Sequence, residues 1–71
     1  METVLRILQI FAKNEVQIIS KRQLMDEIKS WNLEVSFIRD AWHTLMGNGL
    51  IQQNGEEIHL TEKGSAFLNS Q

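Results

Sequence analysis

The side chains that could carry out acid–base or metal chemistry in this chain are few and scattered. His43 and His59 have no third ligand at a matching spacing, so they do not predict a metal site. Glu56 and Glu57 are neighbours in a predicted strand, where successive side chains point to opposite faces and cannot share a reacting centre. The Gly47-Asn48-Gly49 run matches no nucleotide-binding fingerprint, and Ser, His and Asp residues nowhere have the spacing of a catalytic triad. We therefore expect no enzyme, cofactor, metal or small-molecule substrate.

Composition indicates one small folded domain. The chain has 71 residues, 42% of them hydrophobic, which supports a single core and one domain over residues 1–71. It has no cysteine, so disulfides, cysteine-ligated zinc and thiol nucleophiles are excluded. No apolar run approaches the roughly 18–20 residues of a membrane span, and the start Met1-Glu2-Thr3 lacks the positive region of a secretory signal. We expect a cytoplasmic protein with no membrane contact.

The charge of the chain is weakly acidic and unevenly distributed. Seven basic and nine acidic residues give a net charge of −2, so electrostatics alone does not predict a nucleic-acid partner. Residues 21–40 hold four basic and four acidic side chains, whereas residues 52–71 hold Glu56, Glu57 and Glu62 against Lys63 alone. The middle of the chain is therefore neutral, and the acidity lies largely in its last third.

Apolar spacing predicts three helices and a short strand in the first two thirds of the chain. A stripe with spacings of three and four predicts a helix over residues 2–13, which Asn14 ends in a left-handed conformation. Residues 17–19 include two β-branched side chains, Ile18 and Ile19, and predict a short strand or an extended link. Ser20 and Gln23 form a capping box at the start of a helix over residues 21–30. A third helix is predicted over residues 36–47, with Ile38, Ala41, Trp42 and Leu45 on its core side.

A β-hairpin follows the third helix. The Asn54-Gly55 pair predicts a type I′ turn, which places Gln53 opposite Glu56. Leu50 would then fall on the opposite face from the apolar side chains of the hairpin. It is either buried between helices or displaced by a bulge, and the sequence leaves both alternatives open.

A last helix is predicted after the hairpin. Thr61 caps it, Glu62 begins it, and Ala66 is buried with Phe67 or Leu68. The order helix, short strand, helix-turn-helix, two-stranded hairpin and C-terminal helix is that of an α+β winged helix, with the hairpin as the wing.

Two motifs resemble those of a known family. The run LMGNGLI, Leu45–Ile51, is similar to the Leu-x-x-x-Gly-Leu-Ile/Val signature that ends the recognition helix of many bacterial winged-helix regulators. The run IHLTEKG, Ile58–Gly64, resembles the Leu-Thr-x-x-Gly closure that follows their wing. The resemblance is to PadR-like and MarR-like transcriptional regulators, and it covers nearly the whole chain at the level of their DNA-binding core. It implies double-stranded DNA as the partner, with the third helix in the major groove.

The resemblance also implies which residues face DNA. In the third helix these positions match Ser36, Phe37, Arg39, Asp40, His43 and Thr44. At the start of the second helix, the position at which the family commonly contacts phosphate corresponds to Lys21 and Arg22. Their backbone amides, at a helix N-terminus, would also favour an anion. In the wing, the side chains able to read a base edge are Gln53 and Asn54. The predicted DNA-binding residues are Lys21, Arg22, Ser36, Arg39, His43, Thr44, Gln53 and Asn54.

An alternative hypothesis is a winged-helix module that binds a protein. Asp40 would repel phosphate and could only orient Arg39 or accept a hydrogen bond from a cytosine amino group, and the wing carries acids in place of cations. Trp31 and Phe37 would form an apolar patch for a homodimer or another partner if both are exposed near each other. Binding of duplex DNA distinguishes the two hypotheses.

Overall fold

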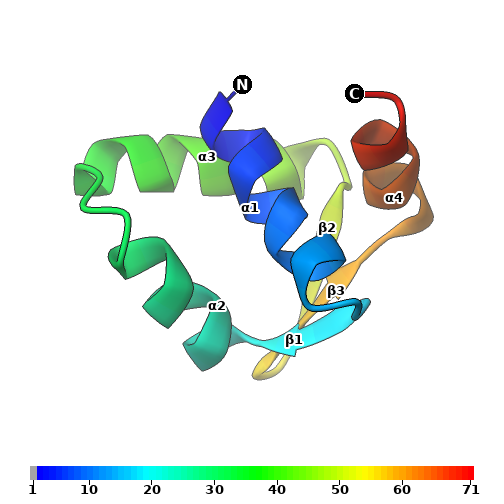
Figure 1. Ribbon diagram of the computed structural model, residues 1–71, viewed down its shortest axis with the longest axis horizontal. Coiled ribbons are helices and arrows are strands. Elements are labelled where there is room, and N and C mark those ends of the chain that lie inside the picture. The colour runs from blue at the N-terminus through cyan, green and yellow to red at the C-terminus, as the bar shows by residue number, and fades with distance from the viewer. Residues whose placement is uncertain (1) are drawn as a thin grey trace.

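The computed structural model describes residues 2–71, which form four helices and a three-stranded antiparallel sheet (Figure 1). In chain order the elements are α1 (Glu2–Lys13), β1 (Ile18–Ser20), α2 (Lys21–Lys29), α3 (Val35–Gly47), β2 (Ile51–Asn54), β3 (Glu57–Leu60) and α4 (Glu62–Asn69). The sheet order is β1-β3-β2. The α+β class and the predicted order of elements are confirmed.

The core lies beneath α1. This helix buries one broad face, Val4, Ile7, Leu8, Ile10 and Phe11. The fully buried side chains that complete the core come from the other layers: Leu24 and Ile28 of α2, Leu45 of α3 and Ile58 of β3. Each such side chain contributes about 1.5–3 kcal/mol by leaving water, so this shared core is a main source of the stability of the fold.

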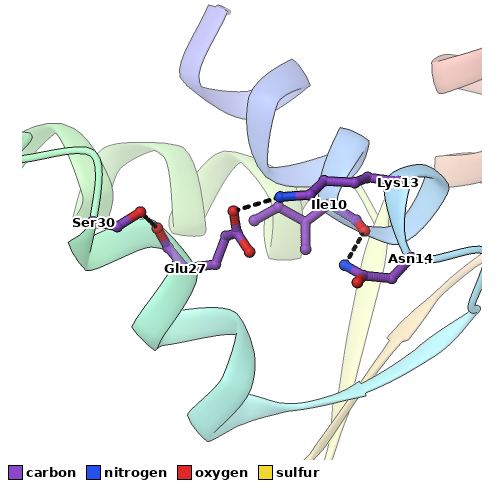
Figure 2. A network of polar contacts seen from close by, with 5 residues as sticks. All are labelled: Ile10, Lys13, Asn14, Glu27 and Ser30. Carbon is purple, nitrogen blue, oxygen red and sulfur yellow. Dashed lines mark hydrogen bonds and ion pairs between the residues drawn. The ribbon is translucent and has the colours of Figure 1, made fainter.

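The end of α1 corrects one prediction. The left-handed residue is Glu15, with φ of 55°, and not Asn14. The Val16 amide donates to Phe11 O and the Glu15 amide to Ala12 O, both at 3.1 Å, which is the Schellman arrangement. Asn14 instead uses its side-chain amide, which donates to Ile10 O at 2.8 Å (Figure 2). Asn14 therefore stabilises the last turn through its side chain, and the next residue makes the turn.

Polar contacts hold α2 beside α1. Lys13 Nζ at the end of α1 lies 2.9 Å from Glu27 Oε2 of α2 (Figure 2). The Arg6 guanidinium of α1 lies 4.2 Å from the centre of the Trp31 ring, just after α2. Surface contacts of these kinds contribute about 0–1 kcal/mol each, so they set the position of α2 more than they stabilise the fold. Glu27 is thereby directed toward α1.

The predicted Ser20 N-cap of α2 is confirmed, although the return bond of the capping box, from the Gln23 side chain to the Ser20 amide, is absent in residues 2–71, and the end of the helix shifts by one residue. Ser20 Oγ accepts from the Gln23 amide at 3.1 Å. The helix ends at Lys29, and Ser30 is its C-cap rather than its last residue. The strand before it is β1, Ile18–Ser20, one residue later than predicted, because the pairing with β3 includes Ser20 opposite Glu57.

The hairpin register differs from the prediction. Gln53 lies opposite Ile58, not Glu56, and the turn residues are Gly55 and Glu56. Gly55 has a φ of 64°. Asn54 and Glu56 have no positive φ, because the non-glycine residues with positive φ among residues 2–71 are Glu15 and Asn32. A single positive φ at the first turn residue is the type II′ pattern, whereas a type I′ turn over Gly55 and Glu56 would need a positive φ at Glu56 as well. The shift is two residues along β3, so the apolar side chains stay on the predicted face.

The base of the hairpin is fixed to α4 by Thr61. Its hydroxyl accepts from the Gly64 amide at 3.0 Å, which confirms the predicted cap. The same hydroxyl lies 2.6 Å from Gly49 O and 3.0 Å from Leu50 O, which share its single proton, and the Thr61 amide donates to Leu50 O at 3.2 Å. Leu50 is buried just before β2, which agrees with the first of its two alternatives.

The prediction for the buried side of α4 is wrong for Ala66, whereas Phe67 and Leu68 pack against the core. Gly64 is buried and Phe67 and Leu68 are half-buried, whereas Ala66 is exposed. Positions three and four residues after Gly64 share its face of a helix, and a position two residues after it does not. The approach of Gly64 to the backbone of Leu50 therefore sets the orientation of α4.

Candidate nucleic-acid interface

The first predicted site element is the start of α2. Lys21 is half-buried and Arg22 is exposed. The Lys21 amide donates to Glu56 O at 2.8 Å, so the turn of the hairpin is attached to the first residue of α2 (Figure 1). This corrects the expectation for the Lys21 amide, which is bound to Glu56 and is not free for an anion. The expectation for the Arg22 amide stays a prediction.

The second predicted element is the exposed side of α3. Ser36, Arg39 and His43 are exposed, and Arg39 and His43 lie one turn apart. The helix begins at Val35, one residue earlier than predicted, and ends at Gly47 as predicted. These side chains are held in place because Ala41 and Leu45 on the other side of α3 are buried in the core.

A hollow between α2 and α3 brings predicted site residues together. It has a volume of about 290 Å³ and is lined by Lys21 and Met25 of α2 and by Val35, Ile38, Arg39, Trp42 and His43 of α3. No carboxylate is among these lining residues in the described part of the chain. Ion pairs within residues 2–71 are Lys13–Glu27 and His59–Glu57, so Lys21 and Arg39 are both available to a ligand.

Asp40 and Thr44 lie on a different side of α3. They line a second hollow with Phe37 of α3 and with Thr3 and Val4 of α1. The Thr44 hydroxyl donates to Asp40 O at 3.0 Å, and Thr44 is half-buried. The structure thus separates Thr44 from the other predicted α3 residues. It also separates Asp40 from Arg39, with which it forms no ion pair in residues 2–71.

The wing residues Gln53 and Asn54 are exposed but do not line the hollow between α2 and α3. The Gln53 side-chain amide donates to Gly55 O at 3.2 Å within the turn. Asn54 lies opposite Glu57, so the two share a sheet face. The Glu57 carboxylate in turn lies 3.2 Å from His59 Nε2. The hairpin therefore offers amides and carboxylates to a ligand, and no cation.

Trp31 and Phe37 do not share a hollow. Trp31 is half-buried and lines a hollow with Arg6, Gln9, Ile10, Lys13 and Glu27. Phe37 is 56% exposed and lies on the second hollow, beside α1. The two aromatic residues therefore belong to separate regions of the surface.

No cluster of three or more His, Asp or Glu side chains suited to a metal ion occurs in residues 2–71.

Sequence reasoning missed the apolar part of the first hollow. Ile38 and Trp42 were assigned to the core, yet both are half-buried and reach its surface, and Val35 is 68% exposed. A helical-wheel projection that begins at Val35 shows the pattern from which this surface could have been predicted. With about 100° per residue, Val35, Arg39, Trp42 and Met46 fall within one narrow sector beside the core side.

The comparisons give no relative to set beside this geometry. No protein-family model, curated protein or solved structure matches the chain. Within residues 2–71, no helix is long and apolar enough to cross a membrane.

Proposed function

We propose that the chain is a winged-helix DNA-binding domain that recognises a specific sequence and acts in transcriptional regulation. One observation carries the proposal: Lys21, Arg39 and His43, which come from two helices, line one hollow that no carboxylate lines among residues 2–71. The cations Lys21 and Arg39, gathered at the surface of a helix-turn-helix pair, are what phosphate binding requires.

The dimensions of α3 suit a major groove. Its 13 residues extend for about 20 Å, and a helix with its side chains is about 10–12 Å wide, close to the groove width of about 12 Å. In this arrangement Arg39 and His43 contact base edges together with Ser36. Lys21 and Arg22 contact phosphates and fix the position of the domain on the duplex.

The acidic residues leave this arrangement intact. Asp40 lies one turn from Ser36, but it lines the second hollow, on the α1 side of α3, and not the hollow that Arg39 and Lys21 share. Glu56 and Glu57 in the hairpin exclude a strong wing–phosphate contact. The hairpin instead contributes the Asn54 side chain, a hydrogen-bonding group without charge. Binding energy therefore comes from α2 and α3 rather than from the wing.

Titration of a labelled duplex at several salt concentrations tests the proposal. Three permanent cations, Lys21, Arg22 and Arg39, should release counterions and give a slope of log affinity on log salt of about −2 to −3. An excess of unlabelled unrelated duplex separates specific from non-specific binding. Absence of binding near about 20 mM salt, or a flat slope, would contradict the proposal.

A further inference from the structure

The hollow between α2 and α3 combines an apolar interior with a basic rim. Met25, Ile38 and Trp42 pack against the core from one side and line the hollow from the other. Val35 stands at its edge and is 68% exposed, the most exposed of the large hydrophobic side chains in residues 2–71. The hollow therefore offers an apolar contact surface and two cations to the same ligand.

Duplex DNA satisfies only part of this surface. Its phosphates match Lys21 and Arg39, but a duplex presents no flexible apolar side chain that could fill a hollow. With a volume of about 290 Å³, the hollow lies at the lower end of ligand pockets, which range over roughly 300–1,000 Å³. A ligand that used the whole site would carry negative charges on either side of one large apolar group.

We propose that the hollow binds a short acidic segment of a partner protein through one or two large apolar side chains. The apolar side chains contact Val35, Ile38 and Trp42, and the flanking carboxylates lie toward Lys21 and Arg39. Charge complementarity selects this occupant: the rim is basic, its lining residues include no acid, and the two cations are without ion pairs within residues 2–71.

Such a partner would compete with DNA, because Lys21 and Arg39 take part in both surfaces. Binding of the acidic segment does not depend on DNA binding, whereas this competition rests on the proposed function. If both proposals hold, a partner segment that occupies the hollow between α2 and α3 releases the domain from DNA. The hollow is then a point at which DNA binding is regulated.

A pair of peptides tests the proposal. The probe is the fluorescein-labelled octapeptide DEDLFDED, and its matched peptide is DEDSSDED, which keeps every charge and lacks the apolar side chains. Fluorescence anisotropy at low salt should give an affinity for the first peptide about tenfold or more above that for the second. Equal affinities, or no binding of either peptide, would overturn the proposal.

Two variants locate the binding site. Val35→Asp places a carboxylate at the edge of the hollow and should weaken binding of the apolar peptide about tenfold or more. Phe37→Asp makes the same kind of change in the same turn of α3, at a side chain that is 56% exposed but lines the second hollow, and should leave the affinity unchanged. Circular dichroism checks that both variants keep the fold. Equal losses in the two variants would overturn the proposed location.

Parallel titrations with duplex DNA separate this proposal from the proposed function. Peptide binding without DNA binding would support the acidic partner and contradict a DNA-binding domain. DNA binding without peptide binding would overturn the acidic partner alone. Self-association of the protein through the hollow, detected as loss of peptide binding at high protein concentration together with sedimentation as a dimer, would also overturn it.

Discussion

Replacement of Gly64 by alanine is expected to lower the free energy of unfolding by about 2–3 kcal/mol, and the melting temperature by roughly 10–20 °C. A Cβ atom at this position would run into the carbonyl oxygen of Leu50 and would lie 2.8 Å from Leu60 Cδ1. Because the Leu50 carbonyl oxygen belongs to the backbone, it cannot move away by a change of rotamer as a flexible side chain can. Either α4 moves away from the base of the hairpin, or the contacts of Thr61 with Leu50 are lost.

Gly47→Ala is the matched control for this prediction. Gly47 also lies in a helix, but a Cβ atom there has no neighbour within 4 Å in the described part of the chain, and its φ is not positive. Alanine is the better helix former, so Gly47→Ala should be neutral or stabilise the protein by up to about 1 kcal/mol. Thermal and urea unfolding measure both variants. A Gly64→Ala variant as stable as Gly47→Ala would contradict the packing of α4 described above.

Charge reversal at Arg39 is expected to have the largest effect on DNA binding. Arg39→Glu removes a cation from the hollow between α2 and α3 and puts a carboxylate beside Lys21 and His43. Loss of a base or phosphate contact costs about 1–3 kcal/mol, so the affinity for duplex DNA should fall about tenfold to a hundredfold. The exposed position of Arg39 on α3 means that the variant should retain the fold.

Lys63→Glu provides the control for the Arg39 variant. It changes the net charge by the same amount at an exposed position of α4, which lies far from α2 in Figure 1. If binding depends on the surface between α2 and α3, Lys63→Glu should change the affinity no more than about twofold. Equal losses in the two variants would indicate that only total charge matters, and the proposed interface would be wrong.

Much of the fold could be predicted because its boundaries depend on local chemistry. Ser20 and Thr61 are caps that a few residues define, and both are present as expected. The motif Leu45–Ile51 is a helix stop: the Leu50 amide donates to Leu45 O at 2.9 Å, and Gly49 has φ of 69°. Both family-like motifs thus have structural roles at the ends of elements. They inform about fold and say little about what the protein binds.

The errors occur where two local solutions differ by little energy. The Asn54-Gly55 pair favours a type I′ turn, but the attachment of the Glu56 carbonyl to Lys21 accompanies a turn one residue later. Similarly, Ala66 has the right spacing for burial, but the close approach of Gly64 to Leu50 turns it toward water. Such contacts between distant segments are not encoded in any short window of sequence.

The candidate site could be predicted in part. Arg39, His43 and Lys21 were expected at one surface, and the structure places them around one hollow. The position of Thr44 on another side of α3 follows from its 100° steps, yet the family pattern grouped it with them. The exposure of Val35 was missed because the helix was expected to begin at the next residue.

An NMR map of amide chemical shifts would show where duplex DNA binds the protein. Isotope-labelled protein would be titrated with a duplex of about 20 base pairs at low salt. We expect the largest shifts on residues 20–23 and on the exposed side of residues 35–43, and the smallest shifts on α4. Shifts confined to α1 and α4, or a spectrum that duplex DNA leaves unchanged, would contradict the claim that the surface between α2 and α3 binds DNA.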